Sequence, residues 1–286
     1  INQQSLKDKI KSYMKHPGSF ILLLLVLIAA VLTVGVLVFL VGYILIRGIP
    51  YLKPSLFAWT YNSDNVSMLP AMINTLFMTV LALLLSVPFG VGAAIYLVEY
   101  AKKGNKLVGI IRVTAETLSG IPSIIYGLFG MLFFVTALKW GYSMMAGAAT
   151  LEIMVLPVIM RTTEEALLCV PDSFREGSFG LGAGKLRTIF KIVLPSAIPG
   201  ILSGIILAIG RIVGETAALI YTSGTVANLA GFFDSGRTLA IHMYSLSREG
   251  MHTNEAYATA VVLLVVVLII NGVSSLIAKK FEAPKQ

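Results

Sequence analysis

An arginine and a glutamate, Arg211 and Glu215, stand four residues apart within an otherwise apolar stretch. This spacing predicts that both side chains lie on one face of a helix. An isolated charge at the centre of a bilayer costs at least about 2.5 kcal/mol, so both must face protein or water. A guanidinium can hold an oxyanion through two hydrogen bonds, and a carboxylate can orient it. The pair predicts a transient anion site, with weaker hydroxyl candidates at Ser119, Ser123 and Thr216.

The same residues also have structural explanations, which the sequence leaves open. Arg211 and Glu215 could neutralise each other or bridge to another helix, because charges within membranes usually pair as well as act. Ser119 and Ser123 flank Pro122, and hydroxyls commonly satisfy a carbonyl that a proline leaves free.

The second polar feature is residues 171–199, which are basic and rich in glycine. Ser173 precedes Glu176 by three residues, the spacing of a capping box, and this predicts a short helix after Pro171. Glycines at 180, 182 and 184 are expected to end it. A second, amphipathic helix is predicted over 185–194 from apolar residues at helical spacing. These are Leu186, Ile189, Phe190 and Val193.

Composition indicates an integral membrane protein. The chain has 286 residues, 57% hydrophobic and 13% charged, with a mean hydropathy of +0.86, whereas soluble domains carry about 25% charged residues. The formal charge of +8 follows from basic cytoplasmic loops, so we expect contact with membrane lipids and not with nucleic acid. One cysteine, Cys169, and three scattered histidines predict neither an internal disulfide nor a metal site.

The apolar runs predict an all-α protein with six transmembrane helices. They cover about 20–46, 69–98, 108–138, a run ending near 160, 197–221 and 257–278. Basic residues place the tail 1–19, the loop 100–106, the stretch 161–195 and both termini in the cytoplasm. Residues 47–68 and 222–256 are then outside loops, and the charges of 222–256 argue against a seventh span. Pro122 is expected to kink the third span.

The 171–199 segment resembles the "EAA" loop of ABC importer permeases, E-A-A-x3-G-x9-I-x-L-P. The matching residues are Glu176, Gly177, Ser178, Gly182, Ile192, Leu194 and Pro195. Gly177 and Ser178 replace the two alanines of the motif, and both are small. In that family the loop docks on a cytoplasmic ATPase. The resemblance implies that Glu176 contacts the ATPase and that Gly182 forms a turn that glycine makes cheaply. An ordinary surface hairpin of two helices is the alternative.

Two further stretches resemble phosphate-specific permeases of the PstA type: SGIPSIIYG at 119–127 and GRIVGETA at 210–217. With the loop, the resemblance covers about 69–280, a permease domain that follows the first span at 20–46. It implies a type I importer permease in the bacterial cytoplasmic (inner) membrane that moves inorganic phosphate inward. The expected partners are a second permease (PstC type), two ATPase subunits (PstB type) and an extracytoplasmic phosphate-binding protein (PstS type).

This chain is expected to be a transport subunit and not an enzyme. It contains no G-x-x-x-x-G-K-[ST] motif, so it needs no cofactor of its own and ATP-Mg would bind to the partner ATPase. Rival interpretations are a permease for another oxyanion such as sulfate or molybdate, a secondary transporter or channel, and a regulatory subunit that does not transport. If the loop couples to an ATPase, we expect a movement at Glu176 to be transmitted to Arg211 along the fifth span.

Overall fold

The computed structural model describes residues 17–102 and 104–281, and within them the chain is helical, with no strand. The predicted tail 1–19 falls almost wholly outside these residues. The long helices are α2 (Pro17–Gly48), α3 (Leu69–Ile95), α6 (Met144–Leu168), α9 (Leu194–Val213) and α12 (Thr253–Phe281). The shorter ones are α4 (Lys106–Ser119), α5 (Ser123–Gly130), α7 (Asp172–Gly180), α8 (Lys185–Thr188), α10 (Ala217–Ile220) and α11 (Leu239–Glu249).

Short non-α turns join or extend these helices. Two 3-10 turns, Ile49–Tyr51 and Pro54–Phe57, follow α2. Turns of π-helix, with their wider hydrogen-bond spacing, extend α3 over Tyr96–Tyr100 and α5 over Met131–Ala137. A third, Ile189–Val193, joins α8 to α9. The last of these makes α8 and α9 one continuous helical rod.

Five helical segments of the described chain are long and apolar enough to cross a membrane, and a bent pair makes a sixth. The five contain α2, α3, α6, α9 and α12, and the pair is α4 with α5 and its π-helical extension. The all-α, six-span prediction is confirmed in this form. Residues 222–256 contain α11, whose 11 residues are too few to span a bilayer.

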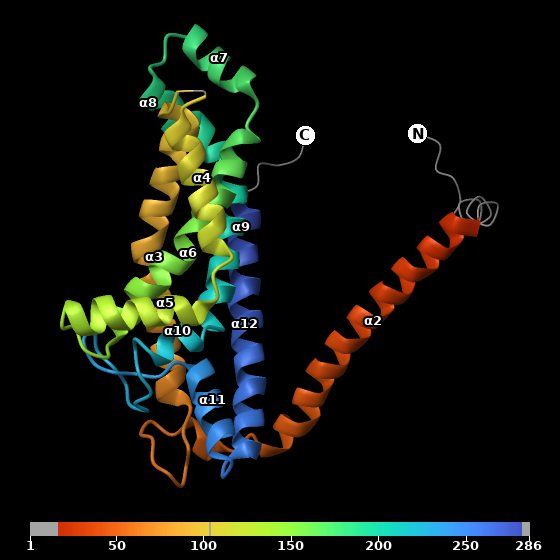
Figure 1. Ribbon diagram of the computed structural model, residues 1–286, viewed down its shortest axis with the longest axis vertical. Coiled ribbons are helices and arrows are strands. Elements are labelled where there is room, and N and C mark those ends of the chain that lie inside the picture. Colours follow the sequence, from red (N-terminus) through yellow and green to blue (C-terminus); the bar gives the residue numbers. More distant parts are fainter. Residues whose placement is uncertain (1–16, 103, 282–286) are drawn as a thin grey trace.

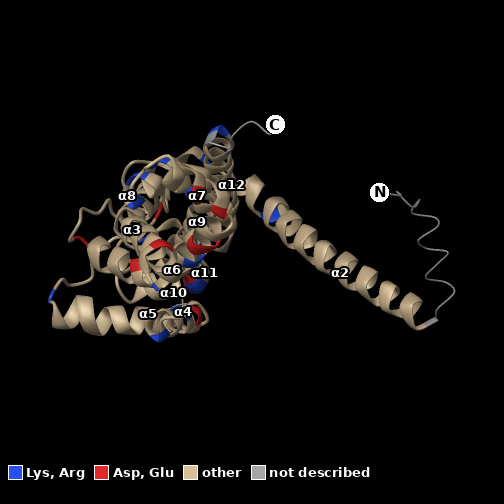
Figure 2. Ribbon diagram, turned by 90° about the horizontal axis from the view of Figure 1, so that it is seen from above, with Lys and Arg blue, Asp and Glu red and all other residues tan. Residues whose placement is uncertain are grey.

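Helix α2 leaves the bundle at an angle and contacts it only near its own C-terminal end (Figure 1). Its apolar side chains are exposed along most of its length. Arg47, its only charged residue, lies at the end next to the bundle, where its guanidinium lies 5.6 Å from the ring centre of Tyr257 (Figure 2). A helix that is apolar on every side belongs in lipid or against another apolar chain.

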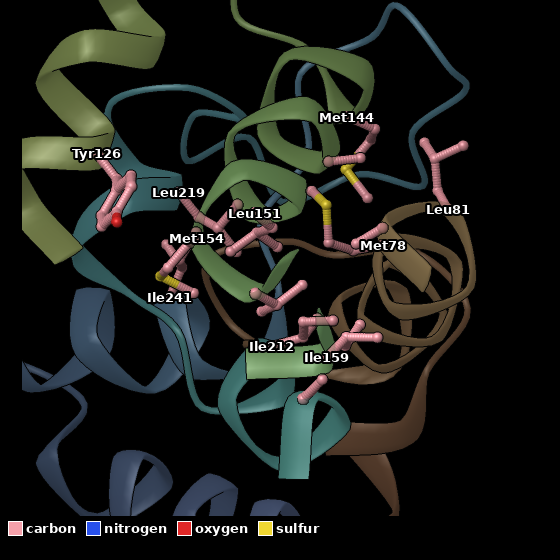
Figure 3. Packing of buried hydrophobic residues seen from close by; sticks show 14 residues of the cluster. Met78, Leu81, Tyr126, Met144, Leu151, Met154, Ile159, Ile212, Leu219 and Ile241 are labelled. Carbon is pink, nitrogen blue, oxygen red and sulfur yellow. The ribbon is translucent and has the colours of Figure 1, made fainter. Parts of the chain in front are cut away.

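The central core lies where α3, α6 and α9 pack together and α5, α10 and α11 close around them. Figure 3 shows its side chains, including the fully buried Met78 of α3, Leu151 of α6 and Leu219 of α10. Small residues allow the close approach. In α6, for example, a Cβ on Gly147 would lie 2.7 Å from the Met78 methyl carbon. This core fixes α10 and the end of α9 relative to α6.

The two ends of the bundle carry different elements (Figure 1). Helices α7 and α8 form one end, and α11 with the 3-10 turns after α2 lies toward the other. The first turn of α2 and the last turn of α12 both point toward the α7 end. The described ends of α2 and α12 are therefore directed to the same end of the bundle as the 171–199 segment.

Three predicted spans differ from the structure. The helix of the fourth span, α6, continues to Leu168 and does not end near 160. The third span is not a kinked helix, because α4 and the helix of α5 are bent by 101° at residues 120–122. Pro122 is extended (φ −58°, ψ 138°) and precedes the first residue of α5. Proline lacks an N–H and restricts the residue before it, so the break is complete. The fifth helix stops at Val213 and not at Tyr221, with Gly214 after it.

Two predictions for the 171–199 segment also need correction. The first helix forms, but Ser173 does not cap it, because Pro171 occupies the capping position and Ser173 is already inside α7. The apolar stripe of the second helix is only half buried. Ile189 and Val193 are buried, whereas Leu186 and Phe190 are 63% and 52% exposed. The contact with Leu97 and Leu167 covers only the Val193 side of the helix.

Candidate functional site

Glu215 lies in the break between α9 and α10 and not within a helix. Its carboxylate oxygen Oε1 accepts hydrogen bonds from the backbone N–H groups of Thr216, at 3.1 Å, and Ala218, at 3.0 Å. The first N–H groups of a helix have no partner inside it, and a carboxylate there stabilises the helix start. Glu215 is 9% exposed. Its carboxylate therefore holds the break in shape.

Arg211 lies in the last turn of α9 and is half-buried. Because the helix ends before Glu215, the two residues do not share one helix face, and that prediction is wrong. No ion pair joins Arg211 to Glu215, or to any other carboxylate among the described residues. The self-neutralising pair is thus absent within this part of the chain.

The α4–α5 break lies beside the α9–α10 break. The Tyr126 hydroxyl of α5 donates to the carbonyl of Leu118 at 2.6 Å, which holds α5 against the end of α4. A Cβ on Gly127 would lie 2.8 Å from the Ala218 Cα, so α5 and α10 touch through backbone at this point. Tyr126 also lies within electrostatic range of Arg211. The stretches 119–127 and 210–217 therefore meet at two broken helices.

The predicted hydroxyl donors are only partly brought together. Ser119 donates to the carbonyl of Glu116 at 2.8 Å, as expected for a hydroxyl that satisfies a helix end. Ser123 makes no side-chain hydrogen bond to a described residue. Thr216 makes one weak contact, at 3.5 Å, with the carbonyl of Gly214. It also lines a largely apolar cavity of about 630 Å³, between α5, α10, α11 and α12, which Arg211 does not line.

The 171–199 segment forms a hairpin at one end of the bundle. Gly182 adopts φ +80°, the left-handed turn that the sequence predicted for it. The hydroxyls of Ser178 and Thr188 are 2.8 Å apart and buried, so they tie α7 to α8. Glu176 and Gly177 are exposed. Ile192 and Leu194 are half-buried where α8 runs into α9, and Pro195 is exposed in the first turn of α9.

The hairpin exposes large apolar side chains among its charged residues. Five large side chains are exposed on it, with Leu181 at the turn 91% exposed. The others are Phe174, Phe179, Leu186 and Phe190. Large apolar side chains that are exposed in this number are typical of a segment that contacts another protein or lipid.

Comparison with known proteins decides the family. Residues 86–283, more than two thirds of the chain, match the family described as "Binding-protein-dependent transport system inner membrane component". This chain belongs to that permease family.

Relatives of the permease include the "Probable ABC transporter permease protein YqgI" of Bacillus subtilis. It is 34% identical over 90% of this chain and 95% of its own length. The "Phosphate transport system permease protein PstA 1" of Mycobacterium tuberculosis is 36% identical over 72% of this chain and 69% of its own. PstA of Yersinia pestis is 36% identical over 70% and 68%, respectively. The permease is therefore of the PstA type.

Solved structures support the fold. A permease chain of a bacterial alginate ABC transporter, solved with an alginate-bound periplasmic protein, matches with a TM-score of 0.70. The two chains share 15% identity, with 97% of this chain and 98% of that chain covered. The methionine transporter MetNI in an inward-facing form matches with a TM-score of 0.59 at 20% identity, over 75% of this chain and 94% of its own. The permease therefore has the ABC importer fold.

Sequence reasoning missed two charged groups of the permease. Arg112 of α4 pairs with the buried Glu164 of α6, and Arg161 pairs with Glu116 at 3.5 Å and Glu165 at 3.2 Å. The spacing of Arg161 and Glu165 could have revealed one of these pairs. The others join distant parts of the sequence, so no local pattern signals them.

Arg175 and Glu99 form the second charged group that sequence reasoning missed. Arg175 counted only as one of the basic residues of the 171–199 segment, yet its guanidinium is largely buried against Glu99 at the end of α3. The sequence signal was weak, because Glu99 is one acid in a basic loop. The arrangement gives the hairpin a fixed seat on the membrane helices.

Proposed function

We propose that this permease moves inorganic phosphate into the cell, driven by ATP hydrolysis on a partner subunit. The observation that carries the proposal is the meeting of two broken helices at Arg211, a half-buried cation with no carboxylate partner among the described residues. A guanidinium in such a place needs an anion, and its planar donors suit a phosphate oxyanion. PstA relatives from two organisms are named as phosphate transport permeases.

Within this site Arg211 would bind phosphate directly, and Glu215 would act by shaping the backbone around it. The hydrogen bonds of Glu215 to Thr216 and Ala218 support this division. Thr216 and Ser123 remain candidate hydroxyl donors, because neither is firmly bonded elsewhere in the described chain. Ser119 is a weaker candidate, since its hydroxyl already has an acceptor.

The proposed orientation puts α7 and α8 in the cytoplasm and α11 on the outer side of the bacterial inner membrane. The beginning of α2 and the end of α12 point toward the α7 end, which agrees with cytoplasmic termini. The hairpin, through its exposed apolar side chains and the exposed Glu176, would dock on a PstB-type ATPase that binds ATP-Mg. Residues 47–68 and 222–256 would face a PstS-type binding protein, and a PstC-type permease would complete the membrane part.

Uptake by the complete transporter in lipid vesicles tests this function. We expect ATP-dependent accumulation of phosphate when this chain, its partner permease, the ATPase and the binding protein are all present. Omitting this chain should abolish uptake, and sulfate should not replace phosphate. Uptake of sulfate or molybdate in preference to phosphate would support the rival oxyanion permease. Uptake that continues without the ATPase would instead support a secondary transporter.

A further inference from the structure

Arg175 joins three elements of the permease at the α7 end of the bundle. Its Nε and Nη2 donate to Glu99 Oε1, at 3.0 and 2.8 Å. Its Nη1 donates to the carbonyl of Val170 at 2.7 Å, and Nη2 also donates to the carbonyl of Leu167 at 2.9 Å. A fifth contact, at 3.2 Å, reaches Asp172 Oδ1. Every N–H of the guanidinium thus has an acceptor.

These acceptors lie on different helices. Glu99 belongs to the π-helical turn that extends α3, whereas Leu167 and Val170 lie at the C-terminal end of α6. The last carbonyls of a helix have no partner within it, and a cation there is favourable. Arg175 itself stands in α7. One side chain therefore fastens the hairpin to the ends of both α3 and α6.

The Arg175–Glu99 pair is shielded from solvent. The two side chains are only 14% and 9% exposed, whereas Asp172, bonded to the same guanidinium, is 81% exposed. Removing one partner of a buried pair leaves the other charge unpaired, which costs far more than the loss of an exposed pair. Removing Glu99 is therefore expected to cost much more free energy than removing Asp172, although both carboxylates contact Arg175.

A second contact joins α8, the other helix of the hairpin, to the π-helical turn that contains Glu99. The Lys185 ammonium of α8 lies 4.9 Å from the ring centre of Tyr100, the residue after Glu99. The Ser178 and Thr188 hydroxyls join the two arms. The hairpin is therefore held as one unit against the last turn of α3, at residues 99–100.

We propose that Arg175 and Glu99 are positioning residues that transmit movement of the hairpin directly to α3 and α6. This rests on the proposed function, in which the ATPase moves the hairpin. The path adds to the continuous rod of α8 and α9, along which the sequence predicted that a push reaches Arg211. Helix α6 packs against α3, α9, α5 and α10, so movement at its end is conveyed to both sides of the Arg211 site.

The test compares variants in the complete transporter reconstituted in lipid vesicles, measuring phosphate taken up per ATP hydrolysed. Glu99→Ala removes the Arg175–Glu99 pair, whereas Glu99→Gln retains one oxygen acceptor for Arg175. Asp172→Ala is the matched control, because Asp172 contacts the same guanidinium. We expect Glu99→Ala to lower uptake per ATP by about tenfold while the ATPase remains bound. Glu99→Gln should recover part of this loss, and Asp172→Ala should change it by about twofold or less.

The outcomes separate this inference from the proposed function. If the wild-type transporter takes up no phosphate with ATP, the proposed function fails. If wild type is active and an assembled Glu99→Ala or Glu99→Gln variant keeps the wild-type ratio of uptake to hydrolysis, the proposed role of the Arg175–Glu99 pair is wrong. Should Glu99→Ala fail to assemble, Glu99→Gln decides the question. If the Arg175–Glu99 pair transmits movement, the uptake per ATP hydrolysed in Glu99→Gln must be lower than in wild type. A loss in Asp172→Ala equal to that in Glu99→Ala would also contradict the proposal.

Discussion

Glu215 shows how a residue can lie in the predicted site and yet be placed there for a different reason. Its carboxylate oxygen bonds the backbone N–H groups of Thr216 and Ala218. A glutamine keeps one oxygen that can accept these bonds, whereas an alanine keeps none. We therefore predict that phosphate uptake survives largely in Glu215→Gln and falls by about fivefold or more in Glu215→Ala. Equal, complete loss in both variants would show that the charge itself is required.

His242 of α11 gives a prediction about pH. Burial, with the nearby charge of Arg237, lowers the pKa of His242 to about 3. Its ring is fully buried. In the unfolded chain the imidazole takes up a proton near its ordinary pKa of about 6.5. Protonation therefore favours the unfolded state as pH falls below that value.

The free energy of unfolding should fall by about 2 kcal/mol between pH 7 and pH 5 through this residue alone. Thermal unfolding of the permease in detergent at the two pH values measures the change. The His242→Leu variant cannot take up the proton, so its stability should depend less on pH. If wild type and His242→Leu lose the same stability between pH 7 and pH 5, this account of His242 is wrong.

At the residue scale the sequence predicted the polar groups but not their contacts. The spacing of Arg211 and Glu215 assumed that the helix continues, and Gly214 ends it. Gly182 was predicted correctly, because a turn with φ +80° depends on a local preference of glycine. Arg175 was missed because its partner Glu99 is 76 residues away. Such pairs follow from the packing of helices, which local patterns do not encode.

The contact between helices α5 and α10 determines the geometry of the site. A Cβ at residue 127 would stand 2.8 Å from the Ala218 Cα, so Gly127→Ala must push the two helices apart. We predict a loss of about 1–3 kcal/mol in stability, with lower phosphate uptake. Gly92→Ala in α3 is the control, because no other side chain or helix lies within 4 Å of its added Cβ. Melting temperatures of the two variants should differ, and equal values would contradict the close contact.

The hairpin of α7 and α8 carries a second prediction at the scale of an element. Gly182→Ala strains the turn by about 1 kcal/mol, because residue 182 has a left-handed conformation. We expect weaker coupling of ATP hydrolysis to uptake and an unchanged preference for phosphate over sulfate. Gly180→Ala, at the end of α7, lacks the positive φ and has open space, so it should behave as wild type. A changed preference in Gly182→Ala would refute this division between coupling and selectivity.

Element boundaries were predictable where composition changes and less so where helices break. The apolar runs located both ends of α2, α3 and α12 to within a few residues. The right angle between α4 and α5 was expected only as a kink, because Pro122 signals a break but not its size. The Tyr126 bond to Leu118 and the Gly127 contact with Ala218 hold that angle, and both depend on tertiary packing.

For the whole molecule, fold and family were accessible from the sequence, because hydropathy and the multi-position EAA spacing are both strong signals. The departure of α2 from the bundle was not. Its apolar surface is exposed on all sides, and no local pattern indicates what covers it. The meeting of 119–127 with 210–217 also emerged only from the fold, and it joins the two stretches that resembled phosphate permeases.

The most direct test of the account is ATP-driven phosphate uptake by the complete transporter carrying Arg211→Gln. Glutamine removes the charge and the paired donors of the guanidinium at the point where the broken helices meet. We predict that uptake falls by at least about 30-fold, the effect of losing one partner of a buried charged contact, while the complex assembles and its ATPase remains active. Uptake within about twofold of wild type would contradict the proposal that phosphate binds Arg211 on its way through the membrane.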